Sequence, residues 1–174
     1  MKLQVRYANH PDDSKHYTTE ELRKHYLMEK VFEEDEILLV YSHQDRIVSG
    51  GIMPVKKVLP LETSDELRAK YFLERRELGI INIGGAGKVT LDGKVYEIKS
   101  KDGMYVGMGT VEVLFESVDP KNPAKFYISS CPAHTTYPTY YIDFEKANHR
   151  PCGEAKTLNK RVINQYIHPD VCKS

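Results

Sequence analysis

An Asp-Gly pair at residues 92–93 constrains the fold of this chain more than any other feature. Two short runs that alternate apolar and polar residues flank it, 88–91 and 94–98. A type I′ turn needs positive φ at both central residues, and Asp-Gly is among the pairs that accept this most readily. The sequence therefore predicts an antiparallel β-hairpin near the middle of the chain.

Short strand-like segments separated by turn signals continue on both sides of this hairpin. They lie at 37–41, 46–53, 56–61, 75–83, 103–106, 110–116 and 124–129. Such regular spacing is typical of an all-β sandwich or barrel. The glycine turn at 84–87 leads into a strand rather than a helix, so it does not predict a nucleotide-binding loop.

One helix is predicted, close to the amino terminus. Thr18 and Glu21 have the spacing of a capping box, and the apolar positions that follow give the helix an apolar face. We divide the chain into an arm with this helix (1–35), a β domain (36–130) and an irregular, proline-interrupted tail (131–174). Within the tail, residues 160–167 fit either a strand or a short helix.

Charge and cysteine content exclude several classes of protein. The chain has 25 Lys and Arg against 25 Asp and Glu, and no basic stripe, so nucleic acid is not an expected partner. No signal peptide or membrane span is recognisable, which predicts a cytoplasmic protein without a membrane partner. Three widely spaced cysteines predict reduced thiols rather than a disulfide framework.

Three long blocks carry a resemblance to a known family. They span residues 41–54, 71–87 and 131–139, in that order. In sequence and spacing they resemble the 4-deoxy-L-threo-5-hexosulose-uronate ketol-isomerases, and the resemblance covers nearly the whole chain. Three long blocks are a much more specific signal than one short motif.

The resemblance implies a fold and an activity. It implies a cupin-like β-barrel or sandwich, one half of a bicupin, with a short amino-terminal helix. The family interconverts 5-dehydro-4-deoxy-D-glucuronate and 3-deoxy-D-glycero-2,5-hexodiulosonate, an aldose–ketose isomerisation in the breakdown of pectin and other uronates. It also implies zinc as cofactor, a small acidic sugar as substrate and assembly into homohexamers.

The zinc ligands of the family have no counterpart here. The family's ligand set, three histidines and a glutamate, starts from a His-x-His-x4-Glu motif, which is absent from this sequence. Aligned on the glycines of a metal-bearing cupin, Lys70 and Phe72 fall at histidine positions, Glu77 at the glutamate and Glu112 at the last histidine. A lysine and a phenyl ring do not suit zinc, so we assign no metal ligand and no cofactor-binding residue.

The chain is therefore predicted to be the metal-free amino-terminal half of such an isomerase. We expect its tail to lead toward a second cupin half that is missing from the sequence. Such a truncated enzyme would be weak or inactive alone. The alternative is a non-catalytic cupin module that binds a sugar acid or serves in subunit assembly.

Three residues are candidates for catalysis. Arg75 and Glu77 are predicted to share one face of a strand, where the arginine could bind a substrate carboxylate through two parallel hydrogen bonds. Ion pairing on a solvated face is the competing interpretation. His134 lies in the proline-bracketed loop, where functional groups are frequent, although a hydrogen bond that fixes the loop would also explain it.

Overall fold

The structure, a computed structural model, describes residues 1–172 and confirms the central hairpin. Strands β6 (Gly87–Leu91) and β7 (Lys94–Ile98) are antiparallel, with Leu91 opposite Lys94. Asp92 and Gly93 both have positive φ, 46° and 83°. These are the signs of φ that a type I′ turn requires.

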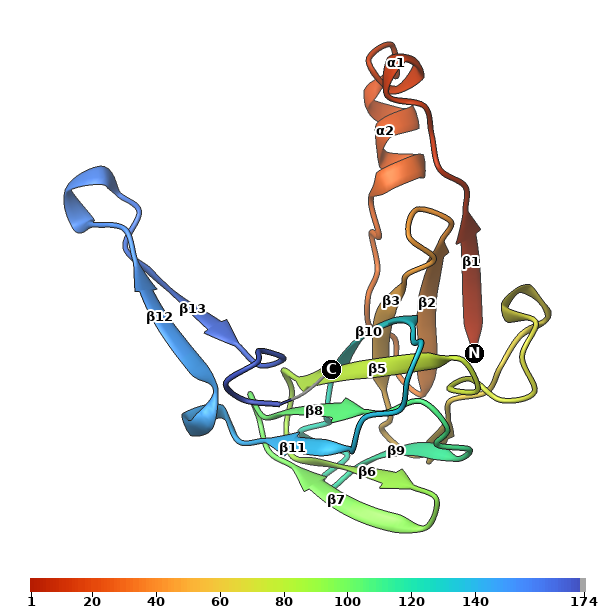
Figure 1. Cartoon of the computed structure of the whole chain (residues 1–174), viewed down its shortest axis with the longest axis vertical. Helices are drawn as coiled ribbons and strands as arrows, with labels where there is room; N and C mark the ends of the chain where they lie inside the picture. Colours follow the sequence, from red (N-terminus) through yellow and green to blue (C-terminus); the bar gives the residue numbers. More distant parts are fainter. Residues whose placement is uncertain (173–174) are drawn as a thin grey trace.

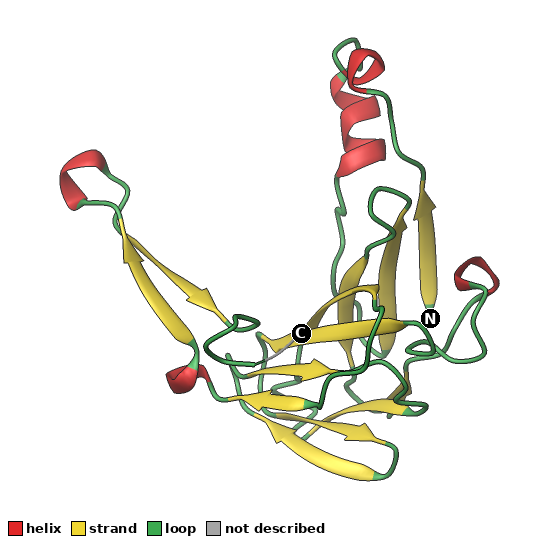
Figure 2. Ribbon diagram, viewed as in Figure 1, coloured by secondary structure: helices red, strands yellow, loops and turns green. Residues whose placement is uncertain are grey.

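Two β-sheets pack face to face, and this hairpin belongs to the smaller one (Figure 2). The larger sheet has seven strands, in the order β1 (Lys2–Arg6), β2 (Glu36–Ser42), β3 (Val48–Met53), β10 (Phe126–Pro132), β5 (Arg76–Asn82), β8 (Gly103–Val106) and β11 (Tyr140–Ile142). The smaller has four, in the order β4 (Leu59–Pro60), β9 (Val113–Ser117), β6 and β7. The predicted all-β sandwich is confirmed.

The hydrophobic core lies between the sheets. Along β5, Leu78 and Ile80 are buried and alternate with residues that face away from the core, as the period of a strand requires. Phe115 of β9 meets Phe126 of β10, with ring centroids 5.1 Å apart. Aromatic pairs of this kind add to the stabilisation that burial supplies.

One buried amide ties the two sheets together at the end of β5. The side chain of Asn82 is inaccessible to solvent, and its Nδ2 donates to the carbonyls of Gly85 at 2.7 Å and Ile98 at 3.0 Å. Its Oδ1 accepts from the backbone N–H groups of Gly84 and Lys125, each at 3.1 Å. Since these partners belong to the glycine turn, the end of β7 and the approach to β10, one side chain fixes where three segments meet.

The glycine turn is required by close backbone approach rather than by unusual dihedral angles. A Cβ atom at Gly85 would lie 2.0 Å from the carbonyl oxygen of Asn122, and one at Gly84 would lie 2.5 Å from that of Pro123. Neither glycine has a positive φ. The turn packs against the loop before β10, so a larger residue would push the two segments apart.

The amino-terminal helix begins at its predicted capping box, and Arg6 of β1 donates to the carbonyl of Leu27 at its end, at 2.7 Å. Helix α2 (Thr19–Tyr26) begins with the capping box of Thr18 and Glu21. None of its residues is buried, and the predicted apolar face stays in solvent. Together with the four-residue α1 (Pro11–Ser14), it projects well beyond the sheets (Figure 1).

Several local predictions differ from the structure. The predicted strand 56–61 shrinks to the two residues of β4, and one 3-10 turn, η1 (Asp65–Leu67), follows it. The amino-terminal arm contributes β1, which pairs in parallel with β2. These differences arise because long-range pairing, rather than local sequence, decides whether a short segment joins a sheet.

The tail is more regular than its sequence indicated. Strand β11 joins the edge of the large sheet, and β12 (Asn148–Cys152) pairs with β13 (Arg161–Gln165) in a separate hairpin. This hairpin projects from the body, with η2 (Phe144–Lys146) before it and η3 (Ala155–Thr157) at its tip (Figure 1). The choice left open at 160–167 is thus resolved in favour of a strand.

Two further observations concern the cysteines and the lengths of the helices. All three cysteines are free thiols. Within residues 1–172, no helix has the length and apolarity needed to cross a membrane.

The Asn82 network predicts a large loss of stability on truncation. Asn82→Ala leaves several buried backbone groups without partners, so we expect the free energy of unfolding to fall by about 2–4 kcal/mol. Urea denaturation followed by circular dichroism measures this change. Asn122→Ala, on an exposed loop, is the matched control, and equal stabilities of the two variants would contradict the role given to Asn82.

Candidate functional site

The outer face of the large sheet carries a group of hydrogen-bonded polar side chains next to a pocket. Because Leu78 and Ile80 face the core, Glu77, Gly79 and Ile81 of β5 face the other way. The antiparallel register places Cys131 of β10 opposite Glu77. On the other side of β5, Tyr105 of β8 lies opposite Gly79.

The Glu77 carboxylate is held by two neutral donors. The Tyr105 hydroxyl donates to its Oε2 at 2.8 Å, and the Cys131 thiol donates to its Oε1 at 3.3 Å. Tyr105 is almost completely buried, whereas Glu77 and Cys131 remain partly exposed. Side chains of the two neighbouring strands therefore orient both carboxylate oxygens of Glu77. One side of the carboxylate still faces the pocket.

Burial and the carboxylate keep both donors protonated. Burial raises the pKa of the Cys131 thiol above its usual value, and the hydrogen bond to Glu77 raises it further. The same two causes, in the same order, raise the pKa of the Tyr105 hydroxyl. At neutral pH these groups act as hydrogen-bond donors and not as a nucleophile or a base.

A pocket of about 380 Å³ lies over this cluster, closed on one side by the tail. Ile167 lies directly above Gly79. A Cβ atom added at Gly79 would be only 2.9 Å from the Cδ1 atom of Ile167. Tyr166 donates from its hydroxyl to the carbonyl of Lys101 at 2.6 Å, which fastens the tail to the body. Among residues 1–172, Glu77 is the one charged side chain that lines the pocket, which suits a ligand that offers hydroxyl groups.

Of the three catalytic candidates from the sequence, Glu77 lines this pocket, whereas Arg75 and His134 do not. Arg75 precedes β5 instead of lying on it, and its guanidinium bonds the carbonyl of Arg68. It lines a different pocket, of about 670 Å³, together with Arg68 and Lys70. Arg75 and Glu77 thus line different pockets, and the structure does not bring their side chains together.

His134 is exposed in the loop after β10. The backbone N–H of the preceding residue, Ala133, donates to the carbonyl of Arg75 at 3.0 Å. The backbone thus places His134 near Arg75, at the same end of the β5–β10 ladder as Glu77. Tyr105 and Cys131 were missed from sequence, and strand alternation with the β5–β10 register was the signal that could have found them.

The residues at the cupin metal positions do not fit zinc. Phe72 is buried in the core, Glu77 faces away from the core, and Lys70 and Glu112 are exposed. Across residues 1–172, no group of three or more His, Cys, Asp or Glu side chains is arranged to hold a metal ion. The donor set and its directions both disagree with a tetrahedral zinc site.

Comparison with known proteins identifies similar chains. The model of the KduI/IolB family matches residues 26–174. A 4-deoxy-L-threo-5-hexosulose-uronate ketol-isomerase of Lachnoclostridium phytofermentans is 53% identical over 172 residues, which are 99% of this chain and 62% of that protein. A second ketol-isomerase of this name, from Enterococcus faecalis, is 50% identical with the same coverage. The chain thus spans about three fifths of the length of these relatives.

A solved structure supports the fold. An IolB-like protein of Salmonella typhimurium superimposes with a TM-score of 0.57 at 12% identity, over 74% of this chain and 47% of that one. At this identity the similarity concerns the fold alone. The predicted cupin-like architecture is confirmed.

The Glu77 cluster predicts a change in thiol reactivity. Glu77→Gln removes the negative charge that raises the Cys131 pKa, so at pH 8 the thiolate fraction and the alkylation rate should rise by about 3- to 10-fold. Iodoacetamide labelling with peptide mass spectrometry measures each cysteine separately.

Tyr105→Phe is the matched control, because it removes one donor but keeps the charge, and no acceleration is expected. Buried Cys172 reports whether either variant has loosened the tail. An unchanged Cys131 rate in Glu77→Gln would contradict the coupling of the two groups.

Proposed function

Because the chain belongs to the KduI/IolB family, we propose that it forms the metal-free cupin half of a uronate ketol-isomerase. The reaction is the interconversion of 5-dehydro-4-deoxy-D-glucuronate and 3-deoxy-D-glycero-2,5-hexodiulosonate. The observation that carries the proposal is 53% identity to a ketol-isomerase over 99% of this chain. Identity this high over so much of the chain is a far stronger argument than the shared fold.

The chemistry explains why we expect this chain to be weak alone. An aldose–ketose isomerisation moves a proton between neighbouring carbons, so it needs a base and a group that stabilises the enediolate charge. We infer that zinc supplies this stabilisation in the ketol-isomerases of the family. Since the cupin metal positions here hold the wrong side chains, we assign no step of the reaction to a metal bound by residues 1–172.

We propose a role for each of the three candidate residues from its position in the structure. Arg75, Arg68 and Lys70 line one pocket together with Asp65 and Glu74, and the excess of one cation there suits the carboxylate of an acidic sugar. Glu77 orients sugar hydroxyls through its free side. His134, at the same end of the ladder, carries an exposed imidazole that can accept and donate a proton.

The remaining expectations stay part of the proposal. We place the reaction in pectin and uronate breakdown in the cytoplasm, carried out by a zinc-containing homo-oligomer that includes a second cupin half. Membership of the KduI/IolB family supports these expectations.

A chimera tests the proposal directly. Residues 1–172 of this chain replace the matched region of the Lachnoclostridium phytofermentans relative, which supplies the rest of its own length. We expect isomerase activity within about 10-fold of that relative, and turnover at least about 100-fold lower from the 174-residue chain alone with added zinc. Both are measured on 5-dehydro-4-deoxy-D-glucuronate.

The outcomes separate the parts of the proposal. A folded chimera without activity would contradict the assignment of this chain to a working isomerase. Turnover by the 174-residue chain that a chelator abolishes would contradict the metal-free half. Arg75→Gln in the active chimera should raise KM by about 10-fold with little change in kcat, because it removes a binding contact.

A further inference from the structure

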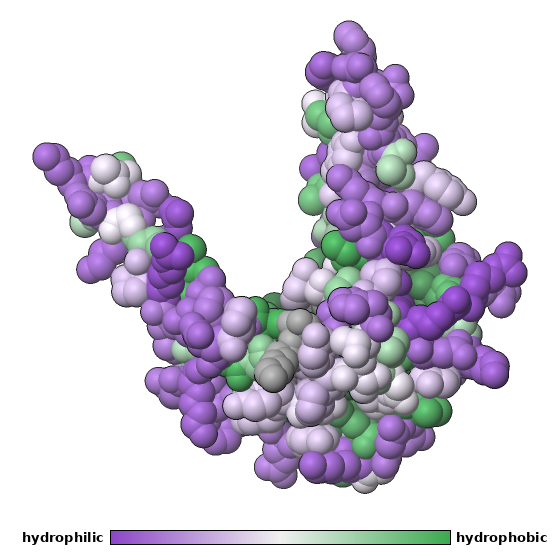
Figure 3. All heavy atoms as spheres, viewed as in Figure 1, coloured by the Kyte–Doolittle hydropathy of each residue, from purple (hydrophilic) through white to green (hydrophobic). Residues whose placement is uncertain are grey.

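A small pocket lies at the base of the amino-terminal arm. Residues of segments 6–9 and 25–28 line it on one side, and the strands β2 and β3 with their turn line it on the other. The arm rises from the end of the large sheet that carries β1, β2 and β3 (Figure 1), and the space-filling view shows the β12–β13 hairpin standing clear of it (Figure 3). The hairpin therefore does not cover this pocket.

The pocket combines aromatic rings with uncharged polar side chains. Two exposed tyrosines, Tyr7 and Tyr26, line it together with an amide, Gln44, and the hydroxyl of Ser49. Its volume of about 240 Å³ is below the range of sites that enclose drug-sized ligands. A site of this size and polarity suits a small ligand with hydroxyl groups and one apolar face.

Tyr7 is 75% exposed, and yet its ring is held in place. It stacks on the imidazole of His43, with ring centroids 4.6 Å apart and 19° between the planes. His43 rests in turn against the buried ring of Tyr41, at 4.9 Å, and the guanidinium carbon of Arg76 lies 5.8 Å from the centroid of Tyr41. This column supports one face of Tyr7 and leaves the other face free, and a ring that is ordered beforehand loses little entropy when a ligand binds.

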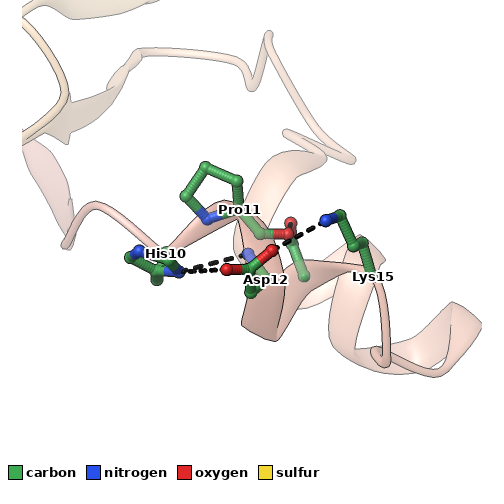
Figure 4. A network of polar contacts seen from close by, with 5 residues as sticks. His10, Pro11, Asp12 and Lys15 are labelled. Atoms are coloured by element: carbon green, nitrogen blue, oxygen red, sulfur yellow. Dashed lines mark hydrogen bonds and ion pairs between the residues drawn. The ribbon is translucent and has the colours of Figure 1, made fainter.

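Hydrogen bonds also order the loop that carries Tyr7. The Asn9 side chain accepts from the hydroxyl of Tyr17 at 2.9 Å and donates to the carbonyl of Tyr7 at 3.4 Å. In the turn that follows, Lys15 pairs with Asp12 at 2.7 Å (Figure 4). The charges of this turn are therefore paired with one another, and the loop is ordered before a ligand arrives.

Arg6 gives the pocket a positive charge. Within residues 1–172 its guanidinium donates only to neutral acceptors, namely the carbonyls of His25 and Leu27 and the side-chain amide of Gln4. Its Nε is buried and has no partner in this part of the chain. No carboxylate of the described residues lines the pocket. A cation without a nearby carboxylate favours an anionic ligand over a neutral one.

We propose that this pocket binds the pyranose ring of a sugar acid, stacked on the free face of Tyr7. The C–H groups on one face of a pyranose pack against an aromatic ring, and its hydroxyl groups bond to polar side chains. Gln44 supplies such a group, because its side-chain amide makes no hydrogen bond with residues 1–172. The carboxylate of the sugar is attracted by Arg6. Binding at this pocket does not depend on isomerase activity.

The pocket neighbours the one that contains Glu77. The hydroxyl of Ser49, which lines the Tyr7 pocket, lies 3.4 Å from the hydroxyl of Ser129, which lines the Glu77 pocket. Both pockets therefore lie on the outer face of the large sheet. Because Tyr7 and Glu77 each line only one of them, variants of these two residues separate binding at one pocket from binding at the other.

Saturation-transfer NMR with D-glucuronate tests the site. The aromatic protons of the 174-residue chain are irradiated, and the signal that reaches the ring protons of the sugar reports stacking, while a titration gives the dissociation constant. The variants are Tyr7→Ala, Tyr7→Phe and Glu77→Gln. Tyr140→Ala is the matched control, because it removes an exposed tyrosine that does not line the pocket.

We expect Tyr7→Ala to raise the dissociation constant by at least about 10-fold, and Tyr7→Phe to stay within about 2-fold because the stacking face remains. Tyr140→Ala and Glu77→Gln should leave the constant unchanged. D-Glucose, which lacks the carboxylate, should bind at least about 5-fold more weakly than D-glucuronate. Circular dichroism melting checks that every variant remains folded.

A wild-type chain that shows no saturation transfer to D-glucuronate would overturn the proposal. So would a Tyr7→Ala variant that binds as tightly as Tyr140→Ala. Equal affinities for D-glucose and D-glucuronate would overturn the choice of a sugar acid. Binding that is lost in Glu77→Gln but kept in Tyr7→Ala would assign the ligand to the Glu77 pocket instead, so failure here is distinguishable from failure of the isomerase proposal.

Discussion

The geometry of this protein depends on the hydrogen bonds of one buried amide. Asn82 sits at the end of β5 with no accessible surface, and it bonds the glycine turn, the end of β7 and the approach to β10. An unpaired polar group at this depth would cost more than a single hydrogen bond contributes, so the partners are held where the amide requires them. The sheets can then close over an apolar core.

Strand β5 joins this core to the candidate site. Its inward side chains, Leu78 and Ile80, fill the sandwich, and its outward side chains begin the pocket that contains Glu77. The position of the carboxylate is therefore fixed by the same packing that fixes the strand. The tail closes the pocket through Tyr166 and Ile167, which the small residues Gly103 and Gly79 allow to approach.

Within residues 1–172 the cupin-like sandwich has no cluster of three or more side chains arranged to hold a metal ion, and two segments project from its body (Figure 1). The interior is filled mainly by apolar side chains, and its few buried polar groups, Asn82 among them, are held by hydrogen bonds. The candidate site with Glu77 therefore lies on the outer face of the large sheet. These features agree with a family whose matched relatives are longer than this chain.

Sequence by itself determined what local chemistry controls. The Asp92-Gly93 turn and the Thr18–Glu21 capping box are set by residues a few positions apart, and both form as predicted. The short, regularly spaced strand-like segments likewise predicted the all-β class. Only the tertiary structure decided that β1 and β11 join the large sheet, that Arg75 and Glu77 line different pockets, and that Tyr105 and Cys131 converge on the Glu77 carboxylate. The physical reason is that these arrangements depend on strand register between distant segments, where a shift of one residue reverses the face that each side chain occupies.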